Sequence, residues 1–249
     1  MNLRRQLLQS VLIQSCGAGA LLLAVIWIGV RQGPEAQGLF NRTKAEVEFV
    51  AAFAMLGMPQ ALFYFVKQGR ISLARAKRWA TVVALLSPAG AVAYALMTHQ
   101  KPGTTGTTAM FALACAACVF HGQLRTLVLA EASSSRFSAI TTAPQILILF
   151  AAVAWAELGR GLMLLSAGLA LSFLLPAVAA WQVLASARHA GMVTDGPVTR
   201  TELLRHGAAS WLAAVLAAAS VVIVQRGVEH AAGAVALGLF TMALTLSQV

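Results

Sequence analysis

The sequence predicts an all-α fold, that of a polytopic helical membrane protein, from three observations. Of the 249 residues, 59% are hydrophobic and only 10% are charged, and the mean hydropathy is +0.78. Soluble domains contain roughly 25% charged residues, so this composition argues against a soluble globular protein. The apolar residues also gather in runs of about 20, the length at which a helix crosses the hydrocarbon core. Lipid offers the backbone no hydrogen-bond partner, so each run is expected to be a helix.

Seven apolar runs are long enough to span a membrane. They cover residues 7–30, 45–66, 79–98, 107–130, 138–156, 162–187 and 207–225. An eighth run begins near Ala234 and reaches Val249, so we expect seven full transmembrane helices and a truncated eighth. The first run has no small-residue cleavage site, which favours a retained helix over a signal peptide.

Four prolines fall inside the expected helices, namely Pro59, Pro88, Pro144 and Pro176. Proline removes a backbone donor and favours a kink, and transporters use broken helices of this kind. Proline is also more frequent in membrane helices than in soluble ones, so each residue equally allows an unbroken helix.

The basic residues orient the chain. With the amino terminus inside, eleven of the 18 Lys and Arg residues lie on the inner side: Arg4, Arg5, Lys67, Arg70, Arg75, Lys77, Arg78, Arg136, Arg188, Arg200 and Arg205. Only four lie outside: Arg31, Lys101, Arg160 and Arg226. Cytoplasmic connectors retain positive charge, so a cytoplasmic amino terminus is expected. The basic segment 67–78 suits anionic lipid headgroups, so membrane lipids are expected partners and nucleic acid is not.

Neither a metal site nor an enzyme is expected. Cys115, Cys118 and His121 have no fourth ligand beside them, and a cysteine pair in an Ala-rich membrane helix is more typical of packing than of zinc binding. Cys16 also lies inside an apolar run, so no disulfide framework is indicated. The sequence has no phosphate-binding loop and no nucleophile elbow, so we expect no catalytic residue and no cofactor.

Two charged pairs stand near the start of the second run. Arg42 pairs with Glu46 and Lys44 with Glu48 at i,i+4, but the pairs point in nearly opposite directions around a helix. At most one pair can therefore face a cavity. The functional interpretation places Arg42 and Glu46 at the outer mouth of a cavity, on a stripe that Phe49, Phe53 and Gln60 continue. The alternative places all four charges at headgroup depth.

His121 and Arg125 form a second candidate site on the fourth run. They lie i,i+4 and share a face with Cys118. Arg125 can reach the headgroups, whereas the shorter His121 cannot, and ionisable groups at that depth usually face a bundle interior or a wet cavity. We predict that both face a central cavity, where they bind an anionic substrate. The alternative is a packed neutral histidine beside an arginine that reaches the surface.

Short motifs resemble a known family. Residues 38–40 (Gly-Leu-Phe) recur as residues 238–240, which suggests a duplicated transporter architecture. The stretch 33–40 (GPEAQGLF) resembles the first outside turn of the oligosaccharide-lipid flippases of bacterial O-antigen, capsule and exopolysaccharide synthesis, in the multidrug/oligosaccharidyl-lipid/polysaccharide exporter superfamily. Residues 56–62 (LGMPQAL) resemble the second-helix pattern of the same family.

The resemblance implies two six-helix lobes around a central cavity. Residues 1–187 would be the first lobe, residues 188–206 a cytoplasmic linker, and residues 207–249 the beginning of an incomplete second lobe. The implied function is the transfer of an undecaprenyl-diphosphate-linked oligosaccharide across a bacterial inner membrane by alternating access. His121, Arg125, Arg42 and Glu46 are the candidate substrate-binding residues.

Two other functions stay open. A cation-coupled drug or metabolite exporter of the same superfamily needs a carboxylate within the membrane, and we expect Glu46 and Glu48 at a helix end instead. The other alternative is a membrane scaffold that does not transport and that docks with polysaccharide polymerase or chain-length proteins.

Overall fold

The computed structural model describes residues 3–98, 105–159, 161–186 and 198–247. These residues form helices and no strand, which confirms the all-α class. The helices are α1 (Leu3–Gln32), α2 (Pro34–Ala54), α3 (Met58–Lys67), α4 (Leu73–Met97), α5 (Thr105–Glu131), α6 (Ser134–Leu158), α7 (Leu162–Ser186) and α8 (Arg200–Ser247). Lys101, Arg160, Arg188 and most of the predicted linker 188–206 lie outside the described residues.

The helices are long and apolar enough for a multi-pass membrane protein. Six of the described helices can each cross a membrane, or seven spans result if α2 and α3 count as one. Helices α1 and α4 to α7 correspond to predicted runs, and most of them extend a few residues further. Helix α8 begins at Arg200, seven residues before the predicted second lobe, so residues 200–206 of the predicted linker are helical. A bend at Gly233, where φ is 82°, separates the last two predicted runs within α8.

The second span differs from the predicted helix at 45–66. It begins at Pro34, so the motif at 33–40 is not an outside turn: only Gly33 is non-helical, with φ 86°. The span then breaks after Ala54, and α2 and α3 meet at a bend of 52°. Leu56 and Gly57 have φ values of 50° and 67°, which no continuous right-handed helix allows.

The backbone groups freed at this break find partners. Pro59 has no N–H to donate to the Met55 carbonyl, and the Met58 N–H bonds to that carbonyl instead at 2.9 Å. The Phe53 carbonyl accepts a hydrogen bond of 3.0 Å from the Trp211 indole nitrogen of α8. Because lipid cannot solvate a carbonyl, these bonds allow a broken helix at membrane depth.

Pro88, Pro144 and Pro176 lie inside helices that remain continuous. A proline inside a helix leaves the carbonyl four residues earlier without its usual N–H donor. At Pro88 and Pro144, a side chain donates a hydrogen bond to this carbonyl instead. Ser87 Oγ donates to the Ala84 carbonyl at 2.7 Å, and His121 Nε2 donates to the Ile140 carbonyl at 3.0 Å. The second bond crosses from α5 to α6 and therefore joins the two helices.

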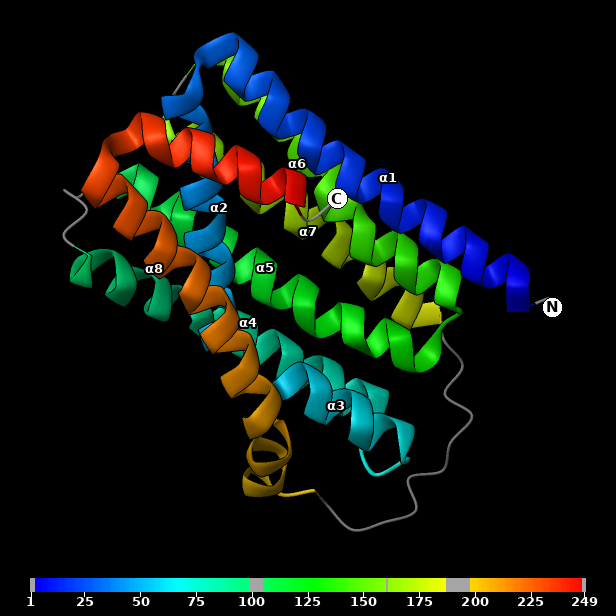
Figure 1. Ribbon diagram of the computed structural model, residues 1–249. Helices are drawn as coiled ribbons and strands as arrows, with labels where there is room; N and C mark the ends of the chain where they lie inside the picture. The colour runs from blue at the N-terminus through cyan, green and yellow to red at the C-terminus, as the bar shows by residue number, and fades with distance from the viewer. Residues whose placement is uncertain (1–2, 99–104, 160, 187–197, 248–249) are drawn as a thin grey trace.

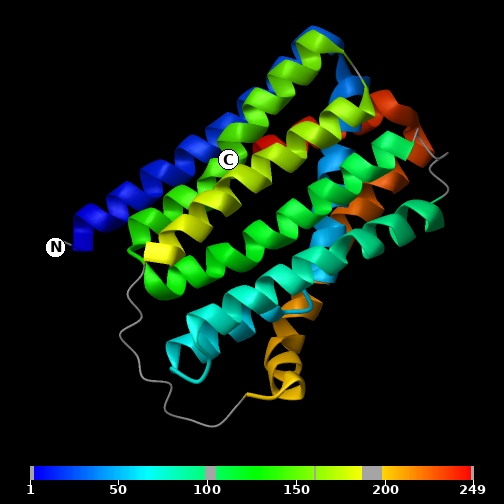
Figure 2. The ribbon, with the colours of Figure 1, turned by 180° about the vertical axis from the view of Figure 1, so that it is seen from behind.

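The helices pack in neighbouring pairs. Helix α1 runs beside α6, and α8 crosses α2, as Figure 1 shows. The view from behind shows α5 and α7 side by side (Figure 2). Small residues allow two of these contacts: Gly17 of α1 and Gly168 of α7 face Gln145 and Ala151 of α6, and an added Cβ atom would collide with those side chains.

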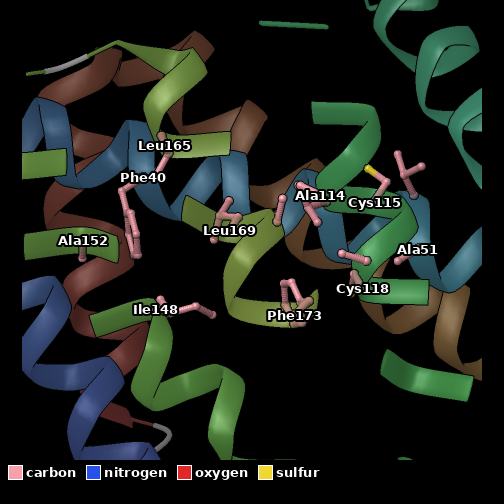
Figure 3. Close-up of a cluster of buried hydrophobic side chains, with 14 of the residues drawn as sticks. Phe40, Ala51, Ala114, Cys115, Cys118, Ile148, Ala152, Leu165, Leu169 and Phe173 are labelled. Atoms are coloured by element: carbon pink, nitrogen blue, oxygen red, sulfur yellow. The ribbon is translucent and has the colours of Figure 1, made fainter. Parts of the chain in front are cut away.

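The main core forms where α2, α5, α6 and α7 meet (Figure 3). Phe40 and Trp155 are nearly fully buried there, with ring centroids 6.4 Å apart. Cys115 and Cys118 are buried and unpaired in this cluster, surrounded by alanines and aliphatic side chains. A second cluster, around Leu62, Phe65 and Leu127, joins α3, α4, α5 and α7 to the start of α8.

Candidate functional site

A half-open cavity of about 210 Å³ lies between helices of the bundle and is lined in part by charged side chains. Its lining residues come from α1, α2, α5, α6 and α7, so it lies within the predicted first lobe and not between that lobe and α8. The lining residues are Leu21, Lys44, Glu48, Met55, Cys118, His121, Gly122, Arg125, Thr141, Pro144, Gln145, Ile148 and Phe173. Cys118, Ile148 and Phe173, labelled in Figure 3, form part of its apolar wall.

Lys44 and Glu48 bring opposite charges to the cavity from α2. Lys44 Nζ donates to Glu48 Oε1 at 2.7 Å, as expected for an i,i+4 pair. Because α2 begins at Pro34, the two residues lie about 15 and 21 Å along the helix axis from its start. The expectation that this carboxylate sits at a helix end is therefore wrong.

His121 and Arg125 both line the cavity, from consecutive turns of α5. His121 is buried, and its Nε2 is engaged by the Ile140 carbonyl of α6. The histidine is therefore a packed structural residue that also borders the cavity. Arg125 stays exposed, and among the described residues it forms no ion pair. Whether these residues bind a substrate stays a prediction.

Arg42 and Glu46 are not among the lining residues. They lie on the opposite side of α2 from Lys44 and Glu48 and face α8. Arg42 donates to Glu46 at 3.3 Å and, through Nη1, to both carboxylate oxygens of Glu229 at 2.7 and 2.8 Å. Arg226 Nη2 donates to Glu46 at 2.9 Å. Arg42, Glu46, Arg226 and Glu229 form an ionic cluster that joins α2 to α8.

Aromatic side chains continue the same face of α2. Phe49 packs on Tyr94 of α4, and Phe53 packs on Trp211 of α8, with centroid distances of 5.8 and 5.7 Å. The Tyr94 hydroxyl also accepts a hydrogen bond of 3.0 Å from Arg226. The predicted stripe of Arg42, Glu46, Phe49 and Phe53 therefore exists, but it packs against neighbouring helices.

The chain matches no protein-family model, no curated protein and no solved structure. The resemblance to oligosaccharide-lipid flippases thus depends on the short motifs alone. Within the described part of the chain, no group of three His, Cys, Asp or Glu side chains is placed to hold a metal ion.

Some cavity residues are not evident from the sequence. The i,i+4 spacing identifies Lys44 and Glu48 as a pair but does not place them at the cavity. The sequence does contain a pattern that groups these two residues on a polar helix face. Polar residues recur at i, i+4, i+7 and i+11 along one face of α2: Gln37, Asn41, Lys44 and Glu48. Thr141 and Gln145 of α6 escape prediction as well, since no sequence pattern distinguishes a cavity-lining threonine from one that bonds within its own helix.

Proposed function

We propose that this chain is a membrane component that moves an undecaprenyl-diphosphate-linked oligosaccharide from the cytoplasmic to the periplasmic leaflet of a bacterial inner membrane. The support for the substrate class is the sequence resemblance of residues 33–40 and 56–62 to the flippase motifs, the first of which is helical from Pro34 in this chain and not a turn. Alternating access is the expected mechanism, with the amino terminus in the cytoplasm.

The observation that carries the proposal is the cationic cavity inside the bundle. Arg125 and Lys44 both line it, and guanidinium and ammonium groups are the usual protein ligands of phosphate. A cavity of about 210 Å³ is smaller than the roughly 300–1,000 Å³ of pockets that enclose a drug-sized ligand. It suits the diphosphate bridge of the substrate and not its sugar chain.

Two ion pairs bring together helix ends that the charge distribution assigns to the same side. Arg31 Nε and Glu157 Oε1, 3.0 Å apart, join the ends of α1 and α6 that the positive charges place outside. Arg70 Nη1 and Glu202 Oε1, 2.6 Å apart, join the connector after α3 to the start of α8, both expected inside.

A reconstitution experiment tests this function. The full chain is placed in liposomes with a fluorescent polyprenyl-diphosphate oligosaccharide, and quenching by an impermeant reagent measures its transfer between leaflets. We expect transfer above that of empty liposomes, and a loss of about tenfold or more in Arg125→Ala and Lys44→Ala, which remove charge-assisted contacts to phosphate. Arg136→Ala, an exposed position on α6, is the control. Transfer equal to that of empty liposomes, or unaffected by both cavity variants, contradicts the proposal.

A second candidate function is a cation-coupled exporter of the same superfamily. The observation that favours it is the place of Glu48, well inside α2 and in the cavity, where a coupling carboxylate is needed. This function predicts drug efflux from liposomes that depends on a proton or sodium gradient and is abolished in Glu48→Gln. Gradient-independent transfer of the lipid-linked oligosaccharide would instead favour the flippase.

A further inference from the structure

Helix α4 runs along one edge of the bundle (Figure 2) and has one buried side. The opposite side of the helix carries exposed residues at helical spacing, which we call the α4 stripe. The stripe consists of two arginines followed by aliphatic side chains: Arg75, Arg78, Val82, Leu85, Leu86 and Ala89. A phospholipid has the same order along the membrane normal, because its phosphate lies at the surface and its acyl chains lie below.

A third arginine reaches the stripe from α8. Arg200, the first residue of α8, places its guanidinium carbon 5.5 Å from the centroid of the Trp79 ring. Trp79 follows Arg75 by one helical turn and packs against the second core cluster, so the ring is a fixed platform beside the stripe. A guanidinium held over a ring keeps the N–H groups at its edges available to a phosphate.

The charge around the three arginines is strongly positive. Residues 67–80 and 198–206 contain seven basic side chains and one acidic side chain, that of Glu202. Glu202 is paired with Arg70 at 2.6 Å. The three arginines are exposed, and within the described part of the chain they form no ion pair. Water can solvate them, but at headgroup depth each also attracts the phosphate of an anionic lipid that lies against α4.

We propose that the α4 stripe and the start of α8 bind one anionic phospholipid of the phosphatidylglycerol class. Arg75, Arg78 and Arg200 hold its phosphate, and the aliphatic part of the stripe contacts its acyl chains. Trp79 lies between these two parts, at the interfacial depth that tryptophan prefers. A zwitterionic lipid is disfavoured, because its ammonium group is repelled by the arginines. No residue of this site lines the cavity, so the site goes beyond the proposed transport function.

Native mass spectrometry of the full chain tests this site, because it counts the individual lipids that a membrane protein retains. The purified chain in detergent is titrated with dioleoyl-phosphatidylglycerol or with dioleoyl-phosphatidylcholine. We expect one phosphatidylglycerol to bind about tenfold more tightly than any further one, and no such first step with phosphatidylcholine. Arg78→Gln and Arg200→Gln are each expected to weaken the first step about fivefold, the contribution of one basic residue near anionic lipid.

Matched variants separate this site from the general attraction of a basic protein for anionic lipid. Arg136→Gln removes an exposed arginine from the start of α6, on the same predicted side of the membrane, and is expected to leave the first step unchanged. Trp79→Phe keeps a ring beneath Arg200 and is expected to retain binding, whereas Trp79→Leu is expected to weaken it. Far-ultraviolet circular dichroism establishes that each variant is folded before affinities are compared.

Three results overturn the inference. These are the absence of a first phosphatidylglycerol distinct from later ones, an equal first step with phosphatidylcholine, and equal losses in Arg136→Gln and in the variants of Arg78 and Arg200. Displacement of the lipid by an equal concentration of glycerol 1-phosphate would show that the headgroup alone is recognised, which overturns the assignment to a phospholipid. Oligosaccharide transfer is measured separately in liposomes, so its absence contradicts the flippase proposal and not the lipid site.

Discussion

Gly38 of α2 and Gly238 of α8 pack backbone against backbone where the two helices cross. A Cβ atom on Gly38 would lie 3.1 Å from the Gly238 nitrogen, and one on Gly238 would overlap the Pro34 carbonyl. Each glycine follows, by five residues, a glycine with nearly the same conformation: Gly33 at φ 86°, ψ 173° and Gly233 at φ 82°, ψ 176°. The repeat is therefore a helix–bend–helix unit, and both bends lie at one end of the molecule (Figure 1).

The first prediction follows from this crossing. Gly238→Ala inserts a methyl group against the α2 backbone, which cannot rotate away as a side chain can. We expect the free energy of unfolding to fall by about 1–3 kcal/mol or more, as in overpacked cores. Denaturation of the purified chain in mixed micelles by sodium dodecyl sulfate, followed by circular dichroism, measures this change.

Gly227→Ala is the control for that experiment. Gly227 lies on the same helix, and a Cβ atom added there would have no neighbour within 4 Å, so the new methyl group only improves helix propensity. We expect no loss of stability there. Equal effects of the two substitutions would show that the crossing does not depend on the absence of a Cβ atom.

The sequence predicts the helices well but not their interruptions. Apolar run length sets most spans, because lipid leaves a helix as the only way to satisfy the backbone. It does not locate the start of α2, since residues 34–44 are too polar to be counted as part of a span. These polar residues are accommodated because Arg42 and Lys44 find ion-pair partners on their two sides.

The candidate site could be predicted only in part. The face shared by His121 and Arg125 follows from helical periodicity, and both residues do line one cavity. Which of the two charged pairs of α2 faces that cavity depends on where α8 packs. Arg226 and Glu229 lie about 180 residues away in sequence, and their contacts with Arg42 and Glu46 are tertiary interactions that no local pattern encodes.

The second prediction concerns the ionic cluster between α2 and α8. Glu46 is only 3% exposed and accepts hydrogen bonds from both Arg42 and Arg226. Glu46→Gln leaves the cluster with one excess positive charge, so we expect a loss of about 3 kcal/mol in the free energy of unfolding. The Glu48 side chain is 43% exposed and pairs with Lys44. Glu48→Gln is therefore expected to lower the free energy of unfolding by less than about 1 kcal/mol. A larger loss at Glu48 than at Glu46 would contradict this account.

The third prediction tests orientation. Gln68 and Glu35 are both exposed and lie at opposite ends of the α2–α3 span. In a Cys16→Ser background, which leaves only the buried Cys115 and Cys118, we expect an impermeant maleimide to label Glu35→Cys in intact cells and Gln68→Cys only after permeabilisation. Labelling of Gln68→Cys from outside would invert the whole topology.

The last prediction concerns the bond between His121 and the Ile140 carbonyl. Pro144 deprives this carbonyl of its helical donor, and His121 Nε2 supplies another at 3.0 Å. We expect His121→Ala to lower the free energy of unfolding by about 1–3 kcal/mol, because a buried acceptor is left without a partner. Pro144→Ala restores the backbone N–H, so the double variant is expected to lose less than the sum of the single losses.

The chain provides a matched control for this cycle. Pro88 also frees a carbonyl, that of Ala84, but Ser87 bonds to it within the same helix at 2.7 Å. The losses in His121→Ala and Pro88→Ala are therefore expected to add within about 0.5 kcal/mol, as for independent sites. Denaturation curves of the single and double variants give both coupling energies. If the losses in His121→Ala and Pro144→Ala were also additive, His121 would not be replacing the donor that Pro144 removes.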